Sequence, residues 1–217
     1  MSTTLVSIFT DPKWVEPLLK AQSVCSKAFN FDKSIMIGPS FGDLDCPSNV
    51  EFRASDKCGP LTWANYSPWI LKNLSSYITT DFCLIYQYDG FIINPDLWSD
   101  DFLDYDYIGA IWPNVGQPNR VGNGGFSLRS KKFIDLCTKL PKESGRFNGE
   151  DWLACVENYN FMKSNGVNFA PIYEAVKFSV EHPMPEKHYV RGDLSTYKSF
   201  GFHDKQNIAA MGIVNYV

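Results

Sequence analysis

Short apolar runs alternate with longer amphipathic segments over the first ninety residues of the chain. The run at residues 5–9 stops at Thr10-Asp11-Pro12, where Asp11 suits a helix N-cap and Pro12 the first helical position. The same pattern predicts strands at residues 34–38, 50–54 and 82–86, and helices at residues 12–29 and 67–77. Strands that alternate with helices need crossover connections. The pattern therefore predicts an α/β fold, with a mixed, mostly parallel sheet flanked by helices.

The pattern becomes less regular after residue 89. An acidic stretch covers residues 99–106, and a loop rich in glycine and asparagine covers residues 115–125. Strands are predicted at residues 91–95, 107–112, 126–129 and 167–171, and helices at residues 131–140 and 150–163. The tail from residue 176 onward shows only mixed short segments. Because no repeat or linker interrupts the chain, we expect one domain over residues 1–217, either a whole protein or part of a longer one.

Composition narrows the class of protein. The 217 residues, 44% of them hydrophobic, suffice for the core of one α/β domain. A net charge of −4, with no basic run, argues against nucleic acid as a partner. Six scattered cysteines without Cys-x-x-Cys spacing indicate reduced thiols, and the apolar run near the N-terminus is too short for a signal peptide or membrane span. We expect a cytoplasmic protein, either in the producing cell or in a host.

The strand at residues 82–86 leads directly to Asp89 and Gly90. In open α/β sheets, ligands bind in the crevice beyond the carboxyl ends of the strands, so Asp89 is placed to hold a divalent cation and its phosphates. The competing interpretation is that Asp89-Gly90 only turns the chain.

Five motifs follow one another in a recognisable order. They are Gln87-Tyr-Asp-Gly90, Asp106-Tyr-Ile-Gly-Ala110, Gly122-Asn-Gly-Gly-Phe-Ser-Leu-Arg129, Gly149-Glu-Asp151 and Gly201-Phe-His203. In this order the chain resembles the GT-A glycosyltransferases, and more narrowly the small predicted glycosyltransferases of bacteria and large DNA viruses. The resemblance begins near Asp81 and implies a single GT-A domain. Residues 1–90 would form its nucleotide-binding half, and residues 91–217 the half that binds sugar and acceptor.

The resemblance implies a metal site. GT-A enzymes use an Asp-x-Asp motif at a strand end to hold a divalent cation, and here the matching residues are Gln87-Tyr88-Asp89. The amide in place of the first carboxylate removes one anionic ligand, which should weaken the affinity for a metal. His203 matches a C-terminal histidine that many GT-A enzymes contribute to the metal, with His182 as the fallback. An oxygen and a nitrogen ligand suit Mn²⁺ or Mg²⁺ as cofactor.

A literal Asp-x-Asp occurs at Asp104-Tyr105-Asp106. These residues precede an apolar strand and do not end one, so their side chains are expected at the opposite edge of the sheet. We interpret this copy as a turn with a solvated face.

Gly149-Glu150-Asp151 resembles the segment of inverting GT-A enzymes that supplies the general base. The resemblance favours Asp151 over Glu150 as the catalytic residue. The structural alternative is helix capping, with Asn148 as N-cap and acidic residues in the first turn.

The sugar and acceptor side is expected at Asn123, Gly124 and Gly125, because the matching GT-A segment lies beside the donor sugar. A tight turn would equally explain these glycines. Trp112 is a candidate for stacking on a sugar, with a place in the core as its alternative.

The nucleoside end is expected from position in the sheet alone. Thr10 and Asp11 follow the first strand, Arg53 ends the third, and Gln87 and Tyr88 lie beside Asp89. A surface ion pair would explain Arg53 equally well.

These residues together predict transfer of a sugar from a nucleoside diphosphate, expected to be UDP, to a hydroxyl of a glycan or another acceptor, with inversion. Two other classes stay open. One is a nucleotidyltransferase that makes nucleotide sugars, although the Gly-rich, basic segment expected after its first strand is missing here. The other is a non-catalytic sugar- or nucleotide-binding module, which the incomplete Asp-x-Asp makes conceivable.

Overall fold

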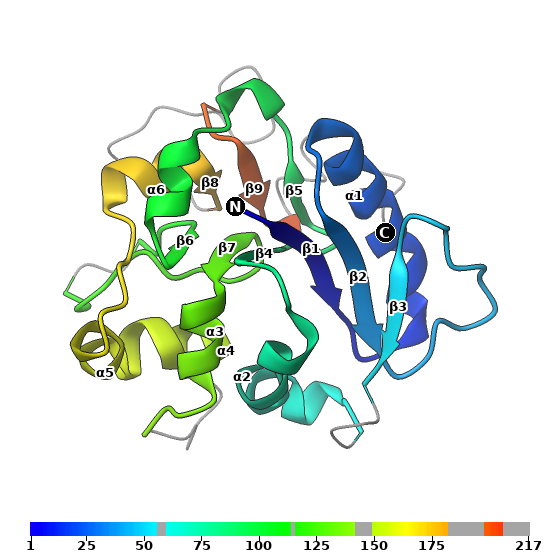
Figure 1. Ribbon diagram of the computed structural model, residues 1–217, viewed down its shortest axis with the longest axis horizontal. Helices are drawn as coiled ribbons and strands as arrows, with labels where there is room; N and C mark the ends of the chain where they lie inside the picture. Colours follow the sequence, from blue (N-terminus) through cyan, green and yellow to red (C-terminus); the bar gives the residue numbers. More distant parts are fainter. Residues whose placement is uncertain (56–59, 114–115, 142–148, 182–197, 206–217) are drawn as a thin grey trace.

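The computed structural model describes residues 1–55, 60–113, 116–141, 149–181 and 198–205. Its first half alternates strands and helices as the sequence pattern predicts (Figure 1). The elements are β1 (Thr3–Ile8), η1 (Pro12–Trp14), α1 (Val15–Ala28), β2 (Lys33–Gly38), β3 (Glu51–Ala54), η3 (Trp63–Asn65), α2 (Tyr66–Tyr77) and β4 (Phe82–Ile85). Asp11 is the N-cap of η1, as expected, and its side chain accepts a hydrogen bond from the Lys13 N–H.

The second half is built from shorter elements. They are β5 (Gly90–Ile92), η4 (Pro95–Leu97), η5 (Asp100–Asp104), β6 (Tyr107–Gly109), β7 (Ser127–Ser130), α3 (Lys131–Cys137), α4 (Glu150–Trp152), η6 (Leu153–Glu157), α5 (Tyr159–Ser164), α6 (Ile172–Phe178), β8 (Ser179–Val180) and β9 (Gly201–His203).

The main sheet has the strand order β3-β2-β1-β4-β7-β6. β3, β2, β1 and β4 run parallel, whereas β7 is antiparallel to both β4 and β6. The end of β4 and the start of β7 therefore lie at the same edge, with Ile85 paired to Ser127. This edge is the carboxyl edge of the parallel strands, where ligands bind in such sheets.

Helices cover both faces of the main sheet. In Figure 1, α1 lies on one side of the strands, and α2 and α3 lie on the other. The side chains of β1 alternate accordingly, because Leu5 belongs to the core under α1 and Val6 to the core under α2. This alternation explains why the parallel strands read as continuous apolar runs in the sequence.

A second, small sheet has the order β5-β9-β8, which the sequence pattern did not predict. Its strands have two or three residues each, too few to produce a period. β5 pairs antiparallel with β9 and places Gly90 opposite His203. The small sheet thus brings the last described segment of the chain beside Asp89.

Two predicted elements differ in the structure. The expected helix at 150–163 is divided by the π-helical turn η6, because Asn158 donates both its backbone N–H and its Nδ2 to the Leu153 carbonyl, five residues earlier. The strand predicted at 167–171 is wrong. Phe169 makes a single bridge to Tyr107, and Pro171 then caps α6.

The literal Asp-x-Asp lies where the sequence predicted it. β6 is antiparallel to β7, hence parallel to β4, so Asp106 lies at the edge opposite Asp89. The Asp106 carboxylate accepts hydrogen bonds from Ser130 Oγ (2.6 Å) and the Asn168 N–H (2.8 Å), which is a structural role.

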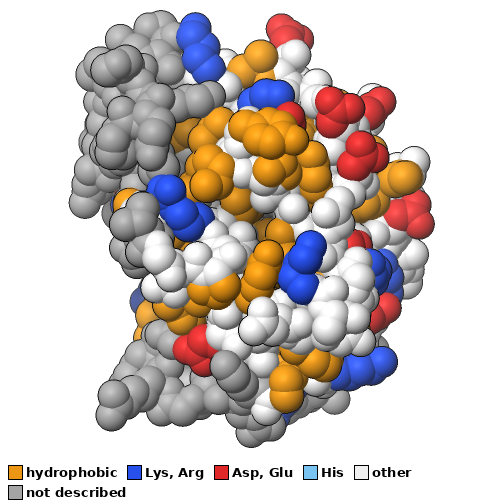
Figure 2. All heavy atoms as spheres, turned by 90° about the vertical axis from the view of Figure 1, so that its left-hand side faces the viewer, with side chains coloured by type: hydrophobic (Ala, Val, Ile, Leu, Met, Phe, Trp, Pro, Cys, Tyr) orange, Lys and Arg blue, Asp and Glu red, His pale blue; other side chains and the backbone are white. Residues whose placement is uncertain are grey.

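The described cysteines are free thiols. Cys25, Cys83, Cys137 and Cys155 are buried and Cys46 is exposed. None of the helices in the described part of the chain has the length and apolar character needed to cross a membrane. On the face that Figure 2 shows, Lys and Arg side chains lie apart from one another, whereas hydrophobic side chains gather in a patch with acidic side chains beside it.

Candidate functional site

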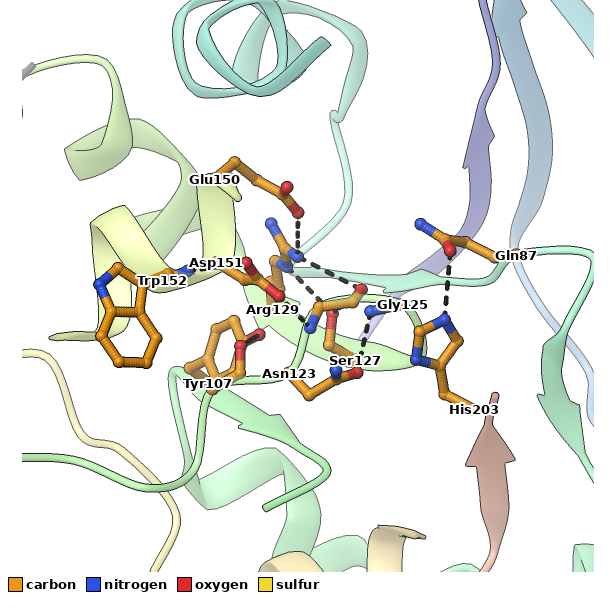
Figure 3. Close-up of polar contacts among 12 residues, drawn as sticks. Gln87, Tyr107, Asn123, Gly125, Ser127, Arg129, Glu150, Asp151, Trp152 and His203 are labelled. Carbon is orange, nitrogen blue, oxygen red and sulfur yellow. Dashed lines mark hydrogen bonds and ion pairs between the residues drawn. The ribbon is translucent and has the colours of Figure 1, made fainter. Parts of the chain in front are cut away.

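The side chains of Gln87, Asp89 and His203 converge just beyond β4, at the carboxyl edge of the main sheet, and Figure 3 shows Gln87 and His203 pointing toward one another. His203 Nε2 lies 3.2 Å from Gln87 Oε1 and 3.6 Å from Asp89 Oδ1. Asp89 is only 6% exposed, and its Oδ1 makes no hydrogen bond within the described part of the chain. A buried carboxylate oxygen without a donor is costly, so this corner is suited to a cation.

Backbone pairing explains why these three residues meet. Gln87 and Gly90 exchange backbone hydrogen bonds of 3.2 and 3.1 Å, which form a tight turn with Tyr88 and Asp89 at its tip. The Asp204 N–H donates to the Asp89 carbonyl at 2.9 Å. The turn that the alternative interpretation predicted is real, and it also aims Asp89 at His203.

Two carboxylates flank the His203 ring. Asp89 lies near Nε2, and Glu181 Oε1 lies 3.3 Å from Nδ1. Burial disfavours a charged imidazole, yet the carboxylates of Asp89 and Glu181, at ion-pair distance on either side, prevail and raise the pKa of His203 to about 10. The pair of carboxylates therefore stabilises positive charge at this position.

The residues present fit the divalent cation that the resemblance implies. Gln87, Asp89 and His203 offer two oxygens and one nitrogen around one point, and Asp89 Oδ1 still lacks a donor. Among the described residues, no group of three His, Cys, Asp or Glu side chains could hold a metal ion. A cation bound here would therefore take its third protein ligand from the Gln87 amide, and further ligands from substrate oxygens or water.

The glycine-rich loop before β7 connects this corner to the proposed base. The Gly124 N–H donates to Asp151 Oδ2 at 2.8 Å, and a Cβ on Gly124 would lie 2.6 Å from Arg129 Nη2. A Cβ on Gly125 would lie 2.1 Å from His203 Nε2. Both positions require glycine because neighbouring side chains approach the backbone closely. The Gly124-Gly125 peptide contacts Asp151 on one side and His203 on the other.

Glu150 and Asp151 have different environments. Glu150 is buried and forms an ion pair with Arg129, whose Nη2 lies 3.0 Å from Oε1. Asp151 is half-buried, and burial followed by the charge of Glu150 raises the pKa of Asp151 to about 7. Of the two carboxylates, Asp151 is the one suited to exchange a proton near neutral pH.

The start of α4 differs from the expected capping arrangement. Gly149 is the N-cap and makes no side-chain hydrogen bond, whereas Asn148 lies outside the described residues. Asp151 Oδ1 accepts from the Trp152 N–H at 2.7 Å, so the carboxylate also serves the first turn.

Asn123 and Trp112 are engaged within the protein. Asn123 Oδ1 accepts from the Gly125 N–H at 3.3 Å, and Asn123 Nδ2 donates to Glu181 at 2.6 Å. Trp112 packs against Trp152, with 5.3 Å between the ring centroids, and is partly buried beside the core. Contact of either residue with a sugar stays a prediction.

The residues proposed for the nucleoside end divide into two groups. Tyr88 stacks on Trp14 at 4.8 Å, and Lys205 Nζ lies 5.6 Å from the Tyr88 ring, close to Asp89. Asp11 pairs with Lys13, Arg53 forms an exposed ion pair with Glu51, and Thr10 is half-buried. The binding roles of Thr10, Asp11 and Arg53 stay predictions.

Several site residues were missed by sequence reasoning. Arg129 ends the motif Gly122-Asn-Gly-Gly-Phe-Ser-Leu-Arg129, and an arginine within a predicted strand was a usable signal for the buried position that the structure shows. Tyr66, at the start of α2, lies close to Gln87 and Glu150, and burial with the charge of Glu150 raises the pKa of its hydroxyl. Glu181 comes from the irregular tail, where no pattern marks it. His182, the fallback ligand, lies outside the described residues.

A family described as "Protein of unknown function (DUF5672)" matches residues 64–203, more than half of the chain. By sequence, no curated protein matches.

Three solved structures are similar over most of the chain. The galactosyltransferase LgtC, in complex with donor and acceptor sugar analogs, is 15% identical with a TM-score of 0.57, covering 98% of this chain and 94% of that one. A glycosyltransferase involved in glycosylation of the major capsid of PBCV-1 is 14% identical with a TM-score of 0.52, covering 100% of both chains. The bifunctional IspDF from Campylobacter jejuni is 10% identical with a TM-score of 0.50, covering 78% of this chain and 49% of that one, so this chain spans about half of its length. These likenesses confirm the expected GT-A fold.

Proposed function

The chain belongs to the DUF5672 family, and we propose that it is a glycosyltransferase that moves a sugar from a nucleoside diphosphate, preferably UDP, to an acceptor hydroxyl. One observation carries the proposal. A carboxylate with a pKa raised to about 7 and a corner suited to a cation lie on either side of the Gly124-Gly125 peptide. Glycosyl transfer needs both, a base for the acceptor and positive charge for the departing diphosphate. The similar fold of LgtC and of the PBCV-1 enzyme supports the same class of reaction.

Asp151 is the proposed base. It removes the proton from the acceptor hydroxyl as the acceptor oxygen bonds to the anomeric carbon and the bond from that carbon to the diphosphate breaks. Asp151 ends protonated, and its raised pKa makes the carboxylate basic enough for this transfer. Glu150 forms an ion pair with Arg129 and balances the charge of that guanidinium beside the Gly124-Gly125 loop.

Gln87, Asp89 and His203 are the proposed ligands of the divalent cation. When bound, Mn²⁺ or Mg²⁺ supplies positive charge against the charge that grows on the diphosphate. The Lys205 ammonium, beside Tyr88 and Asp89, is placed to add a second positive charge at this side. Tyr88 and Trp14 present a stacked aromatic surface that suits the nucleoside.

Inversion at the anomeric carbon follows from this assignment. With Asp151 acting on the acceptor, one in-line displacement suffices, and it leaves the product with the opposite configuration. Determining the anomeric configuration of the product would check this part separately.

The proposal is tested with Asp89→Asn and its matched control Asp104→Asn. The wild-type chain, given UDP-sugars and Mn²⁺, should release UDP slowly by transfer to water. We expect Asp89→Asn to lower this rate at least about 100-fold, because it removes the one carboxylate of the ligand set. Asp104→Asn should stay within about twofold, because Asp104 lies in η5 before β6, at the opposite edge.

Three outcomes would count against the proposal. Loss of activity in Asp104→Asn alone would move the metal to the other Asp-x-Asp. Release of pyrophosphate from a sugar phosphate and UTP would indicate a nucleotidyltransferase. Tight binding of UDP without turnover over any acceptor would indicate a binding module.

A further inference from the structure

We propose that Glu181 is a positioning residue for His203, and that Asn123 holds Glu181 in turn. The inference rests on the proposed function, because it concerns the same metal site. Neither the sequence motifs nor the family match assigns a role to Glu181.

Strand register places Glu181 beside His203. β8 pairs parallel with β9, with Ser179 opposite Gly201 and Val180 opposite Phe202. One further step along the same register brings Glu181 level with His203. This pairing explains why a residue from the irregular tail reaches the site.

The contacts of Glu181 account for both of its oxygens. Oε1 lies 3.3 Å from His203 Nδ1, and Oε2 accepts a hydrogen bond of 2.6 Å from Asn123 Nδ2. Asn123 Oδ1 in turn accepts from the Gly125 N–H at 3.3 Å. The Glu181 side chain is only 12% exposed, so these contacts are shielded from water.

The ring geometry separates the role of Glu181 from that of a ligand. Nδ1 and Nε2 lie on different sides of the imidazole, and Glu181 approaches the Nδ1 side while Gln87 and Asp89 share the Nε2 side. A carboxylate on the far nitrogen of a metal-binding histidine keeps the proton there, orients the ring and makes the other nitrogen a better ligand. Glu181 therefore aims His203 Nε2 at the corner formed with Asp89.

The chain of contacts also couples the metal corner to the base. Asn123 joins Glu181 to the glycine loop, whose next residue, Gly124, donates to Asp151. A displaced Glu181 would therefore disturb His203 directly. Through Asn123 it would also disturb the glycine loop, whose Gly124 N–H donates to Asp151.

The experiment reverses the Asn123–Glu181 pair. In Glu181→Gln, an amide whose oxygen faces His203 must turn its NH₂ group toward the NH₂ group of Asn123, so two donors meet. In Asn123→Asp, two carboxylates meet. The double variant Asn123→Asp/Glu181→Gln restores one donor and one acceptor, and the carboxylate introduced at position 123 can still accept from the Gly125 N–H.

The readout is the affinity for Mn²⁺ in the presence of UDP, measured by electron paramagnetic resonance of free Mn²⁺. Each single variant should bind Mn²⁺ at least about tenfold more weakly than the wild type, and the double variant should return to within about threefold of it. Glu174→Gln is the matched control, because Glu174 is equally buried and pairs with Lys177 away from the site. Its Mn²⁺ affinity should equal that of the wild type.

Wild-type affinity in Glu181→Gln would overturn the inference, and so would a double variant no better than the single ones. Asp89→Asn tells these failures apart from failure of the proposed function. If Asp89→Asn loses Mn²⁺ while Glu181→Gln keeps it, only the role of Glu181 is wrong. If Asp89→Asn also keeps Mn²⁺, the metal site is wrong, and the positioning role falls with it.

Discussion

Asp151 is the side chain whose protonation state matters most for the proposed chemistry. Its pKa is raised to about 7, by burial first and then by the charge of Glu150. Only the ionised carboxylate can accept the proton of the acceptor. We therefore expect kcat/KM to rise with pH through about 7 and then to level off. Asp151→Asn should lose both the activity and this limb of the pH profile, as measured by UDP release.

The same pKa predicts an effect on stability. In the unfolded chain the pKa of this carboxyl is near its ordinary value of 3.8, so between that pH and about 7 the folded chain binds more protons than the unfolded chain. The contribution of Asp151 to stability is therefore lost as pH rises through about 7. Urea unfolding measures the free energy of unfolding of Asp151→Asn minus that of the wild type. This difference should be more positive at pH 9 than at pH 5. A difference that is the same at both pH values would mean that the pKa of Asp151 is not raised.

Position in the sheet made Asp89 predictable, whereas Glu181 was not. Asp89 follows a buried strand, and that position alone marks it. Glu181 matters only because β8 and β9 pair in one register, which a two-residue strand does not reveal in the sequence. Asn123, expected beside the sugar, also joins Gly125 to Glu181, a contact that the sequence did not reveal, and its contact with a sugar stays a prediction.

Among the elements, β7 and α4 are joined by a buried ion pair. Arg129, 1% exposed, contacts Glu150 at 3.0 Å and Ser127 Oγ at 3.0 Å. Removing one partner leaves the other buried charge uncompensated. Glu150→Leu should therefore cost about 3–5 kcal/mol of unfolding free energy, and the double variant Arg129→Met/Glu150→Leu should cost less than that. Urea unfolding of the single and double variants measures both values.

Two results would contradict this assignment. Costs that simply add in the double variant would mean that the two side chains do not stabilise each other. A Glu150→Gln variant with normal stability and no activity would make Glu150 the base in place of Asp151.

The glycine loop before β7 makes a separate prediction. A methyl group on Gly125 would lie 2.1 Å from His203 Nε2, so Gly125→Ala must push the imidazole away from Asp89. We expect Gly125→Ala to bind Mn²⁺ with UDP at least about tenfold more weakly, while the fold is retained. Gly116→Ala is the control: its φ of +95° also strains an alanine, but its Cβ would meet nothing within 4 Å, so the position of His203 and the Mn²⁺ affinity should not change. Unchanged Mn²⁺ affinity in Gly125→Ala would place the cation elsewhere.

The strands of the main sheet and the longer helices followed from the sequence pattern, whereas the pairing of the small sheet did not. The parallel strands are apolar because helices cover both faces of the sheet, and this run of side chains is visible in the sequence. The small sheet β5-β9-β8 is held by tertiary pairing, and the helix after Gly149 is interrupted because Asn158 donates twice to Leu153. The site is assembled in part from these short elements, so the sequence pattern did not reveal how its residues meet.

For the whole molecule, the GT-A fold brings two distant parts of the chain to one edge. The first part forms β1 to β4 and ends at Asp89, and the second returns at β9 with His203. Binding of UDP and a cation between them should add stability, because the ligands bind only the folded chain.

The most direct test of the account is a crystal structure with UDP and Mn²⁺, in which anomalous scattering locates the manganese. The account predicts one manganese peak about 2.2 Å from an Asp89 oxygen and from His203 Nε2, with diphosphate oxygens completing the coordination. A diphosphate bound without manganese at this corner, or a manganese peak elsewhere with Asp89 turned away from the nucleotide, would contradict it.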